Sequence, residues 1–341
     1  SGERATPTFV SYAQGADEPS LGSVPKSRRF AHPADTVFNW QALAETPSSQ
    51  EPGKTPFAYE SGDDGELELA LSAGRVPVRE VYSFVFSEAA LYTGQKGIEA
   101  GWPDGDHQVV LSVPSGLAPG RRQALISLAR SAGLNVVHTV DELKAQFLAT
   151  AIANASIGTS GAPIGLVDVG GWTTQACVLD PMAWNQGLDA MEYGALSRRD
   201  GVGSEFLHHT LVDHLSLNFA LRHGVDLRND HLALERLFSA AEEAAVQLST
   251  SSAAKIHLPF ITGDHTGPKH LETTLRQAEY ASVVESVTDE IAAVAADTIS
   301  DASLTAQDLA AVVLVGGGSK SPAIRDAIQN KLGVRVFIPE R

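Results

Sequence analysis

The pattern of apolar and polar positions along the chain changes repeatedly between a strand period and a helix period. Residues 6–13 alternate and are β-branched or aromatic, which predicts a strand, whereas apolar residues recur at helical spacing between 78 and 93. For the first half we expect strands at 6–13, 107–114 and 135–140 and helices at 78–93, 118–133 and 141 to about 154. Gly133 ends the second of these helices, because a glycine commonly closes a helix.

The second half begins with a buried strand, a tight glycine turn and a second strand, in the sequence GLVDVGGWTTQACVLD over 165–180. It continues with expected helices at about 203–221, 229–250 and 281–300, a strand at 254–261, and a strand, glycine turn and helix over 310–333. Strands alternate with helices in both halves, which predicts an α/β fold with mostly buried sheets. A stretch rich in proline, glycine and acidic residues at 45–66 predicts an exposed excursion, and 154–163 predicts a flexible joint.

Composition is that of an ordinary soluble globular protein, with 43% hydrophobic and 19% charged residues in 341. The net charge of −16 argues against nucleic acid or an anionic membrane as a partner. A membrane span needs about 20 apolar residues in a row, and the longest such run here, 309–315, has only the length of a strand, so no membrane span is expected. The single cysteine, Cys177, excludes an intrachain disulfide and is expected to be a buried thiol. The 11 histidines show no metal-ligand spacing, so we expect no metal site.

Two glycine-rich strand ends, at 170–171 and 316–318, mark a candidate ligand cleft between the halves. Either turn could hold an anion at a helix start, or could simply need backbone conformations that glycine allows. Asp168 ends a strand, where a carboxylate can hold magnesium through water or can bond the turn. Glu142 opens a helix, where an acidic residue is favourable without any chemistry. The residues alone leave these alternatives open.

Taken in order, the segments resemble the nucleotide-binding domain of Hsp70 chaperones, in the actin–hexokinase–Hsp70 superfamily. The resemblance covers nearly the whole chain and rests on colinear motifs. They are GERATPTFVSY, HPADTVFNWQALAE, VVLSVPSGLAPGRRQALISLARSAGLNVVHTVDE, LVDVGGWTT, ALERLFSAAEEAAVQLSTSSAAKIHLPFI and VVLVGGGSKSPAIRDAI. It implies an α/β, two-lobed, actin-like fold in which each lobe has a mixed sheet flanked by helices and a smaller subdomain. We expect a first lobe over 1–155, incomplete at its N-terminus, and a second over 156–341, incomplete at its C-terminus.

In the family, Mg-ATP lies in a central cleft. Glycine hairpins hold the phosphates, a lysine and a carboxylate help to position the attacking water, and a helix clamps the adenosine. The resemblance places the catalytic carboxylate at Glu142 and a second carboxylate at Asp168. The positions that correspond to the family's nucleotide site are Gly170, Gly171, Trp172, Thr173, Gly203, Gly316, Gly317 and Gly318. We regard this site as degenerate because of the departures described next. Several of the retained residues are also needed for turns of the fold, so their presence alone does not indicate nucleotide binding.

The sequence departs from the family at several of its working positions. The catalytic lysine aligns with Gln41, and the third glycine of the second phosphate motif is Trp172, whose bulk should occupy phosphate space unless the ring rotates outward. The basic pair on the adenosine-clamping helix aligns with Ala245 and Val246, and the first adenosine motif becomes 202–204, Val-Gly-Ser. The first phosphate hairpin and the peptide-binding domain have no counterpart in the sequence. Losing one positioned cation typically costs 10²–10³-fold in rate, so these losses together should abolish turnover.

These departures predict a catalytically inactive Hsp70-like protein, a pseudo-ATPase, that serves as a structural or scaffold subunit of a larger assembly. Its partners would then be protein subunits, with no cofactor required. One alternative is a regulatory or cochaperone-type module that binds ATP or ADP without hydrolysis. Another is an active ATPase whose missing ends lie outside the sequence. A soluble intracellular location is expected, and the start without methionine is compatible with mitochondrial import.

Overall fold

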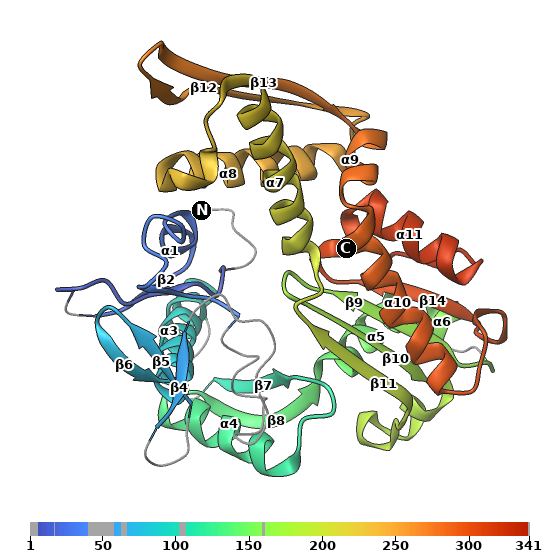
Figure 1. The fold of residues 1–341 in the computed structure, drawn as a ribbon. Helices are drawn as coiled ribbons and strands as arrows, with labels where there is room; N and C mark the ends of the chain where they lie inside the picture. Colours follow the sequence, from blue (N-terminus) through green and yellow to red (C-terminus); the bar gives the residue numbers. More distant parts are fainter. Residues whose placement is uncertain are drawn as a thin grey trace. The chain divides into compact units, whose positions relative to one another are not determined.

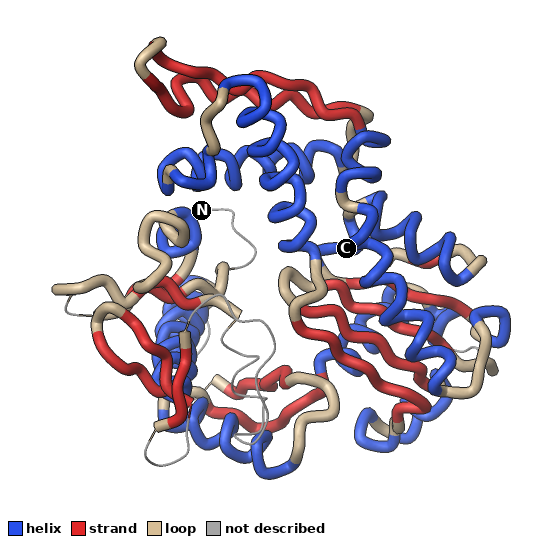
Figure 2. Tube along the Cα trace, viewed as in Figure 1, coloured by secondary structure: helices blue, strands red, loops and turns tan. Residues whose placement is uncertain are grey.

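A computed structural model of the chain describes residues 6–16, 18–39, 58–62, 67–101, 107–158 and 161–339. The chain separates into two compact units, which divide between Glu142 and Leu143. Both are built from helices and strands (Figures 1 and 2). The domain limits expected from the sequence, 1–155 and 156–341, stay a prediction. Among the described residues, no helix has the length and apolar character needed to cross a membrane.

Unit 1 holds three small sheets and their helices. Its elements are β1 (Val10–Ser11), β2 (Ser20–Leu21), α1 (Ser23–Ser27), β3 (Thr36–Val37), β4 (Tyr59–Ser61), β5 (Leu67–Leu71), β6 (Gly74–Pro77), α3 (Val78–Glu99), β7 (Gln108–Val113), α4 (Pro119–Ser131) and β8 (Asn135–Asp141). The strands pair in the orders β2-β1-β3, β4-β5-β6 and β7-β8. The first two sheets are antiparallel, whereas β7 and β8 are parallel and joined through α4.

Among the described residues, two apolar clusters stabilise this unit. The larger joins the short sheets to the start of α3, through residues that include Val10, Val37, Leu69 and Val81, all fully buried. The smaller packs Ala129 of α4 near β8. The predicted strands at 107–114 and 135–140 and the helix between them are confirmed. The predicted strand at 6–13 is shorter than expected, because only Val10 and Ser11 pair with neighbours.

Unit 2 is organised around a mixed sheet with the order β11-β10-β9-β14-β15. Its strands are β9 (Ile164–Val169), β10 (Thr173–Leu179), β11 (Tyr193–Asp200), β14 (Ala311–Val315) and β15 (Val336–Phe337). β9, β10 and β11 form an antiparallel meander. β14 pairs with β9 in parallel, and β15 pairs in parallel with β14. Its helices are α5 (Glu142–Ala153, which begins with the last residue of unit 1), α6 (Ala155–Gly158), α7 (Ser204–His223), α8 (His231–Leu248), α9 (Gln277–Val283), α10 (Glu285–Asp301) and α11 (Pro322–Leu332).

Both faces of this sheet are covered, which explains why β9 and β10 are buried along nearly their whole length. Alternate residues of each strand point to opposite faces. One face, with Leu166 and Cys177, forms a core with Phe147 of α5. The other face contacts α10 (Figure 1). Cys177 is only 1% exposed, which confirms the predicted buried thiol, and burial raises the pKa of this thiol.

A second layer of unit 2 is a long hairpin of β12 (Ala253–Asp264) and β13 (Gly267–Arg276) next to α7 and α8. The sequence predicted only the first part of β12 and did not predict β13. The helix expected at 281–300 is confirmed as α10, with α9 as a separate turn before it, because the chain bends at Val284. Part of the expected excursion at 45–66 is a strand, β4, and 40–57 and 63–66 lie outside the described residues.

Candidate functional site

The turn between β9 and β10 is the centre of the predicted site. It is tight, because the N–H of Gly170 donates to the carbonyl of Thr173 at 2.9 Å and leaves only Gly171 and Trp172 at the tip. Gly171 is exposed, and a Cβ added there would meet nothing within 4 Å. Gly170 is different, because an added Cβ would lie 3.1 Å from the carbonyl oxygen of Thr173. The tip glycine is thus not required by packing.

The first turn of α7 lies against this hairpin. The N–H of Ser204 donates to the carbonyl of Gly170 at 2.9 Å, and the N–H of Glu205 donates to the carbonyl of Gly171 at 2.8 Å. Gly203 makes this approach feasible, because a Cβ there would lie 2.7 Å from the carbonyl carbon of Gly171. The first amides of a helix are the groups that usually bind an anion. Here two of them are already bonded to the hairpin.

The second glycine turn, at 316–318, follows β14 and lies beside the end of β9. Gly316 has a φ of 82°, and a Cβ there would lie 2.5 Å from the carbonyl oxygen of Val169 and would collide with the Asp168 carboxylate. A Cβ on Gly318 would meet Cγ1 of Val169 at 2.5 Å. Gly317 is exposed, with nothing within 4 Å. Packing therefore explains the first and third glycines of this turn but not the second.

Asp168, near the end of β9, is bonded by a residue that the sequence analysis missed. Nε2 of Gln146, on α5, donates to Oδ2 of Asp168 at 2.8 Å. The amide oxygen of Gln146 is buried and has no hydrogen-bond partner among the described residues. A carboxylate that accepts from a side-chain amide offers fewer free lone pairs to a magnesium ion or its waters.

Thr173 is bonded in the same way. It lies opposite Asp200 in the register of β10 and β11, and its hydroxyl donates to Oδ1 of Asp200 at 2.7 Å. Nε and Nη2 of Arg198 donate to the same carboxylate oxygen at 3.1 Å each. The hydroxyl that would face a phosphate is therefore directed to an anion of the protein itself. The charge of Asp200 is balanced by this ion pair with Arg198.

The ring of Trp172 packs against the start of α7. It meets Phe206 edge-on, with ring centroids 5.0 Å apart, and His209 at 5.8 Å. His209 in turn lies 4.6 Å from Phe238 of α8. Trp172 is thus one end of a row of aromatic rings that connects the hairpin with α7 and α8. Edge-to-face pairs of this kind contribute about 0.5–1.5 kcal/mol each beyond area burial.

The structure brings together most of the predicted positions in unit 2. They are Asp168, Gly170, Gly171, Trp172, Thr173, Gly203, Gly316, Gly317 and Gly318. Ala245 and Val246 lie further along α8, and Val246 is 66% exposed. Glu142 is the first residue of α5 and belongs to unit 1. Gln41 lies outside the described residues.

These contacts are a poor fit for Mg-ATP in unit 2. The amide donors at the start of α7, the Thr173 hydroxyl and the Asp168 carboxylate all have protein partners, and the tip carries an indole. Within the described residues, no group of three or more histidine, cysteine or acidic side chains could hold a metal ion. Gln146 and Asp200 were missed because their roles depend on which elements become neighbours, although pairing β10 with the next strand could have indicated Asp200.

A family model described as Hsp70 protein matches residues 1–336. It confirms the resemblance seen in the sequence motifs. Together with the two units described above, it also confirms the α/β, two-lobed, actin-like fold class.

Proposed function

Because the chain belongs to the Hsp70 family, we propose that it is a catalytically inactive member, a pseudo-ATPase, that acts as a structural subunit of a larger protein assembly. The observation that carries the proposal is the internally bonded hairpin at 170–173. The Thr173 hydroxyl donates to Asp200 at 2.7 Å, and the Asp168 carboxylate accepts from Gln146 at 2.8 Å.

Charge placement supports the same conclusion. Phosphoryl transfer depends on cations and donors fixed around the γ-phosphate. The position that resembles the family's lysine is Gln41, and the basic pair on α8 is replaced by Ala245 and Val246. Removing one positioned electrostatic donor typically costs 10²–10³-fold in rate.

A structural role is supported by apolar side chains exposed on the helices of unit 2. Leu217 and Leu221 are 54% and 78% exposed and lie four residues apart on α7, so they share one face of the helix. Leu232 and Val246 of α8 are 69% and 66% exposed. Single exposed apolar residues are common, but a pair on one helix face is typical of a contact with another protein. A mitochondrial location is part of the same proposal and would be tested by cell fractionation.

Calorimetric titration with Mg-ATP and Mg-ADP, together with a phosphate-release assay, tests the first half of the proposal. We expect no binding heat up to about 1 mM nucleotide, equivalent to less than about 4 kcal/mol of binding free energy, and no phosphate release above the buffer blank. Micromolar binding by the wild-type chain, or turnover that Asp168→Asn abolishes, would refute it.

Two variants locate the cause. Trp172→Gly restores the glycine that the family has at this position, and Gln146→Ala frees one oxygen of Asp168. Any nucleotide affinity that appears in these variants and not in Leu217→Ala, a matched truncation of an exposed residue, assigns the loss to the hairpin. For the second half of the proposal, native extracts should contain the chain at a fixed ratio to other subunits. Finding it only as a lone monomer would contradict the structural role.

A further inference from the structure

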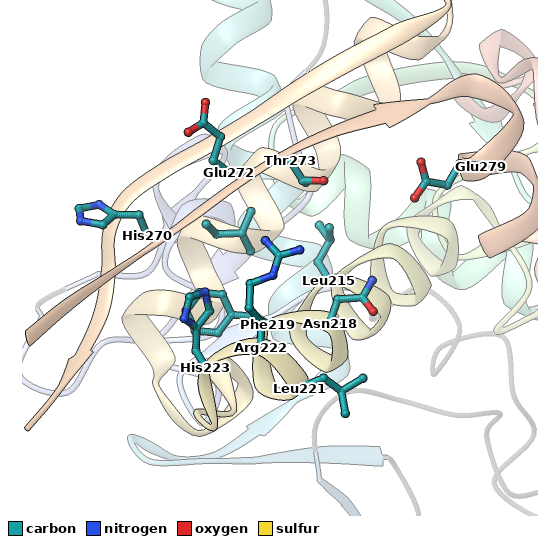
Figure 3. Close-up of a pocket in the computed structure, with 11 residues that line it drawn as sticks. Leu215, Asn218, Phe219, Leu221, Arg222, His223, His270, Glu272, Thr273 and Glu279 are labelled. Carbon is teal, nitrogen blue, oxygen red and sulfur yellow. The ribbon is translucent and has the colours of Figure 1, made fainter. Parts of the chain in front are cut away.

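A cavity of about 480 Å³ lies between α7 and β13 in unit 2, away from the glycine turns (Figure 3). Its lining comes from the last turns of α7, from four consecutive residues of β13, 270–273, and from Glu279 of α9. Successive side chains of a strand point to opposite faces. Four consecutive residues can therefore line one cavity only if the backbone edge of the strand faces it.

The register of the hairpin shows which backbone groups lie on that edge. The N–H of Gln277 donates to the carbonyl of Ser252, directly opposite, at 2.9 Å. In an antiparallel pair, mutually bonded positions recur every second residue. The bonded pairs that follow are Leu275–Ala254, Thr273–Ile256 and Leu271–Leu258. The N–H and C=O groups of Glu272 and Thr274 therefore point away from β12, and within the described part of the chain no third strand pairs with this hairpin.

The floor of the cavity is apolar. Leu215 and Phe219 of α7 and Leu271 of β13 are 5%, 4% and 6% exposed, so their packing is fixed before any partner arrives. A preformed apolar floor beside an open strand edge is the arrangement by which proteins bind an extended peptide: the backbone ladder supplies affinity and the floor accepts alternate side chains.

The charge at this edge is positive at its centre. Arg222 extends from α7 toward β13 (Figure 3) and makes no ion pair with the residues that the structure describes. Glu272, across the cavity, is bonded by Lys255 at 2.7 Å and is thereby neutralised. His223 stacks on Phe219, with ring centroids 4.5 Å apart. Glu279 lies at the far end of the cavity in Figure 3. The unpaired guanidinium favours a carboxylate as its partner.

We propose that the outer edge of β13 binds an extended segment of a partner protein as a third strand, with an apolar side chain on Phe219 and an acidic side chain at Arg222. The backbone of the segment bonds to the outward groups of Glu272 and Thr274. This inference rests on the proposed role as a subunit and specifies the chemistry of one partner, an acidic and apolar alternating segment.

The test uses a synthetic peptide of alternating valine and aspartate, titrated into the full chain without nucleotide. A twin peptide carries N-methyl groups on the amides that would donate to β13, and a second twin has lysine in place of aspartate. We expect the first peptide to bind with submillimolar affinity, and each twin to bind at least about tenfold more weakly. Amide exchange at Glu272 and Thr274 should slow only with the first peptide.

Arg222→Glu should weaken binding of the acidic peptide at least about tenfold, whereas Arg325→Glu, the same charge reversal on exposed α11, should leave it unchanged. Equal binding of the N-methylated peptide, equal effects of the two variants, or no binding at about 1 mM would each overturn the inference. If the peptide does not bind but extracts contain the chain at a fixed ratio to other subunits, the docking edge is wrong and the proposed function is still supported. Nucleotide binding, measured separately, bears only on the proposed function.

Discussion

Replacing Gly203 by alanine should destabilise unit 2 although the residue is extended, with φ at −172°. The new Cβ would lie 2.7 Å from the carbonyl carbon of Gly171 and 2.9 Å from the carbonyl oxygen of Gly170. Both neighbours are backbone atoms of a tight turn, so neither can rotate away. The turn or the start of α7 must shift, and the hydrogen bonds that Ser204 and Glu205 donate would lengthen.

The expected loss follows from these contacts. Overpacking of a fixed site costs about 1–3 kcal/mol, and each weakened hydrogen bond about 1 kcal/mol. We therefore expect Gly203→Ala to lower the free energy of unfolding by about 2–4 kcal/mol. Gly171→Ala is the matched control, because its Cβ meets nothing within 4 Å; its change should stay within about 0.5 kcal/mol.

Urea denaturation followed by far-ultraviolet circular dichroism measures both variants against the wild type. We expect the two variants to differ clearly in their free energy of unfolding, although Gly203 and Gly171 are neighbours in space. If Gly203→Ala unfolds within about 0.5 kcal/mol of Gly171→Ala, the close approach of α7 to the hairpin is wrong, and the retained glycines need another explanation, such as a ligand.

Three further outcomes are expected. Asp230 accepts two backbone N–H groups at the start of α8, at 3.0 and 3.1 Å, so Asp230→Ala should lower the free energy of unfolding by about 1 kcal/mol in denaturant titrations. The hydroxyl and N–H of Thr266 lower the pKa of Asp264 from 3.8 to about 2, so the stability that this carboxylate contributes is present above pH 3.8 and is lost as the pH falls through about 2. The melting-temperature difference between wild type and Asp264→Asn should shrink over that interval, and a constant difference would contradict this. Cys177 is 1% exposed and burial raises its pKa, so a thiol reagent should label it only after unfolding; labelling of the native chain at the rate of a free thiol would show that the core opens.

The sequence was sufficient to predict the strands that are buried on both faces of their sheet. Apolar residues fill most of β9 and the second half of β10, because α5 packs on one face of their sheet and α10 on the other. β13 could not be identified in the same way. Only Leu271 and Leu275 of this strand are buried, four residues apart, and polar side chains occupy the positions between them. Burial alternates strictly along β13, but the inward position between the two leucines is Thr273, so the sequence shows no two-residue hydrophobic period and the strand is assigned only by its pairing with β12.

The candidate site was predictable in its positions but not in its bonding. The glycine turns could be located because they follow apolar strands. Gln146 and Asp200 could not, because each meets its partner only after α5 and β11 have packed on the sheet, 22 and 27 residues away along the chain. Hydrogen-bond partners at that separation depend on register and helix rotation, which local patterns do not determine.

A glycine in a former phosphate turn has two independent reasons to be glycine, and only the structure separates them. Packing alone requires Gly203, Gly316 and Gly318, so these three would be retained by a chain that binds no nucleotide. Gly171 and Gly317 are open, and a ligand is the feature that would restrict them. A family motif is therefore informative about nucleotide binding mainly through the positions that packing leaves free. Trp172 stands where the sequence comparison predicts the family's third turn glycine, and its indole joins the hairpin to α7.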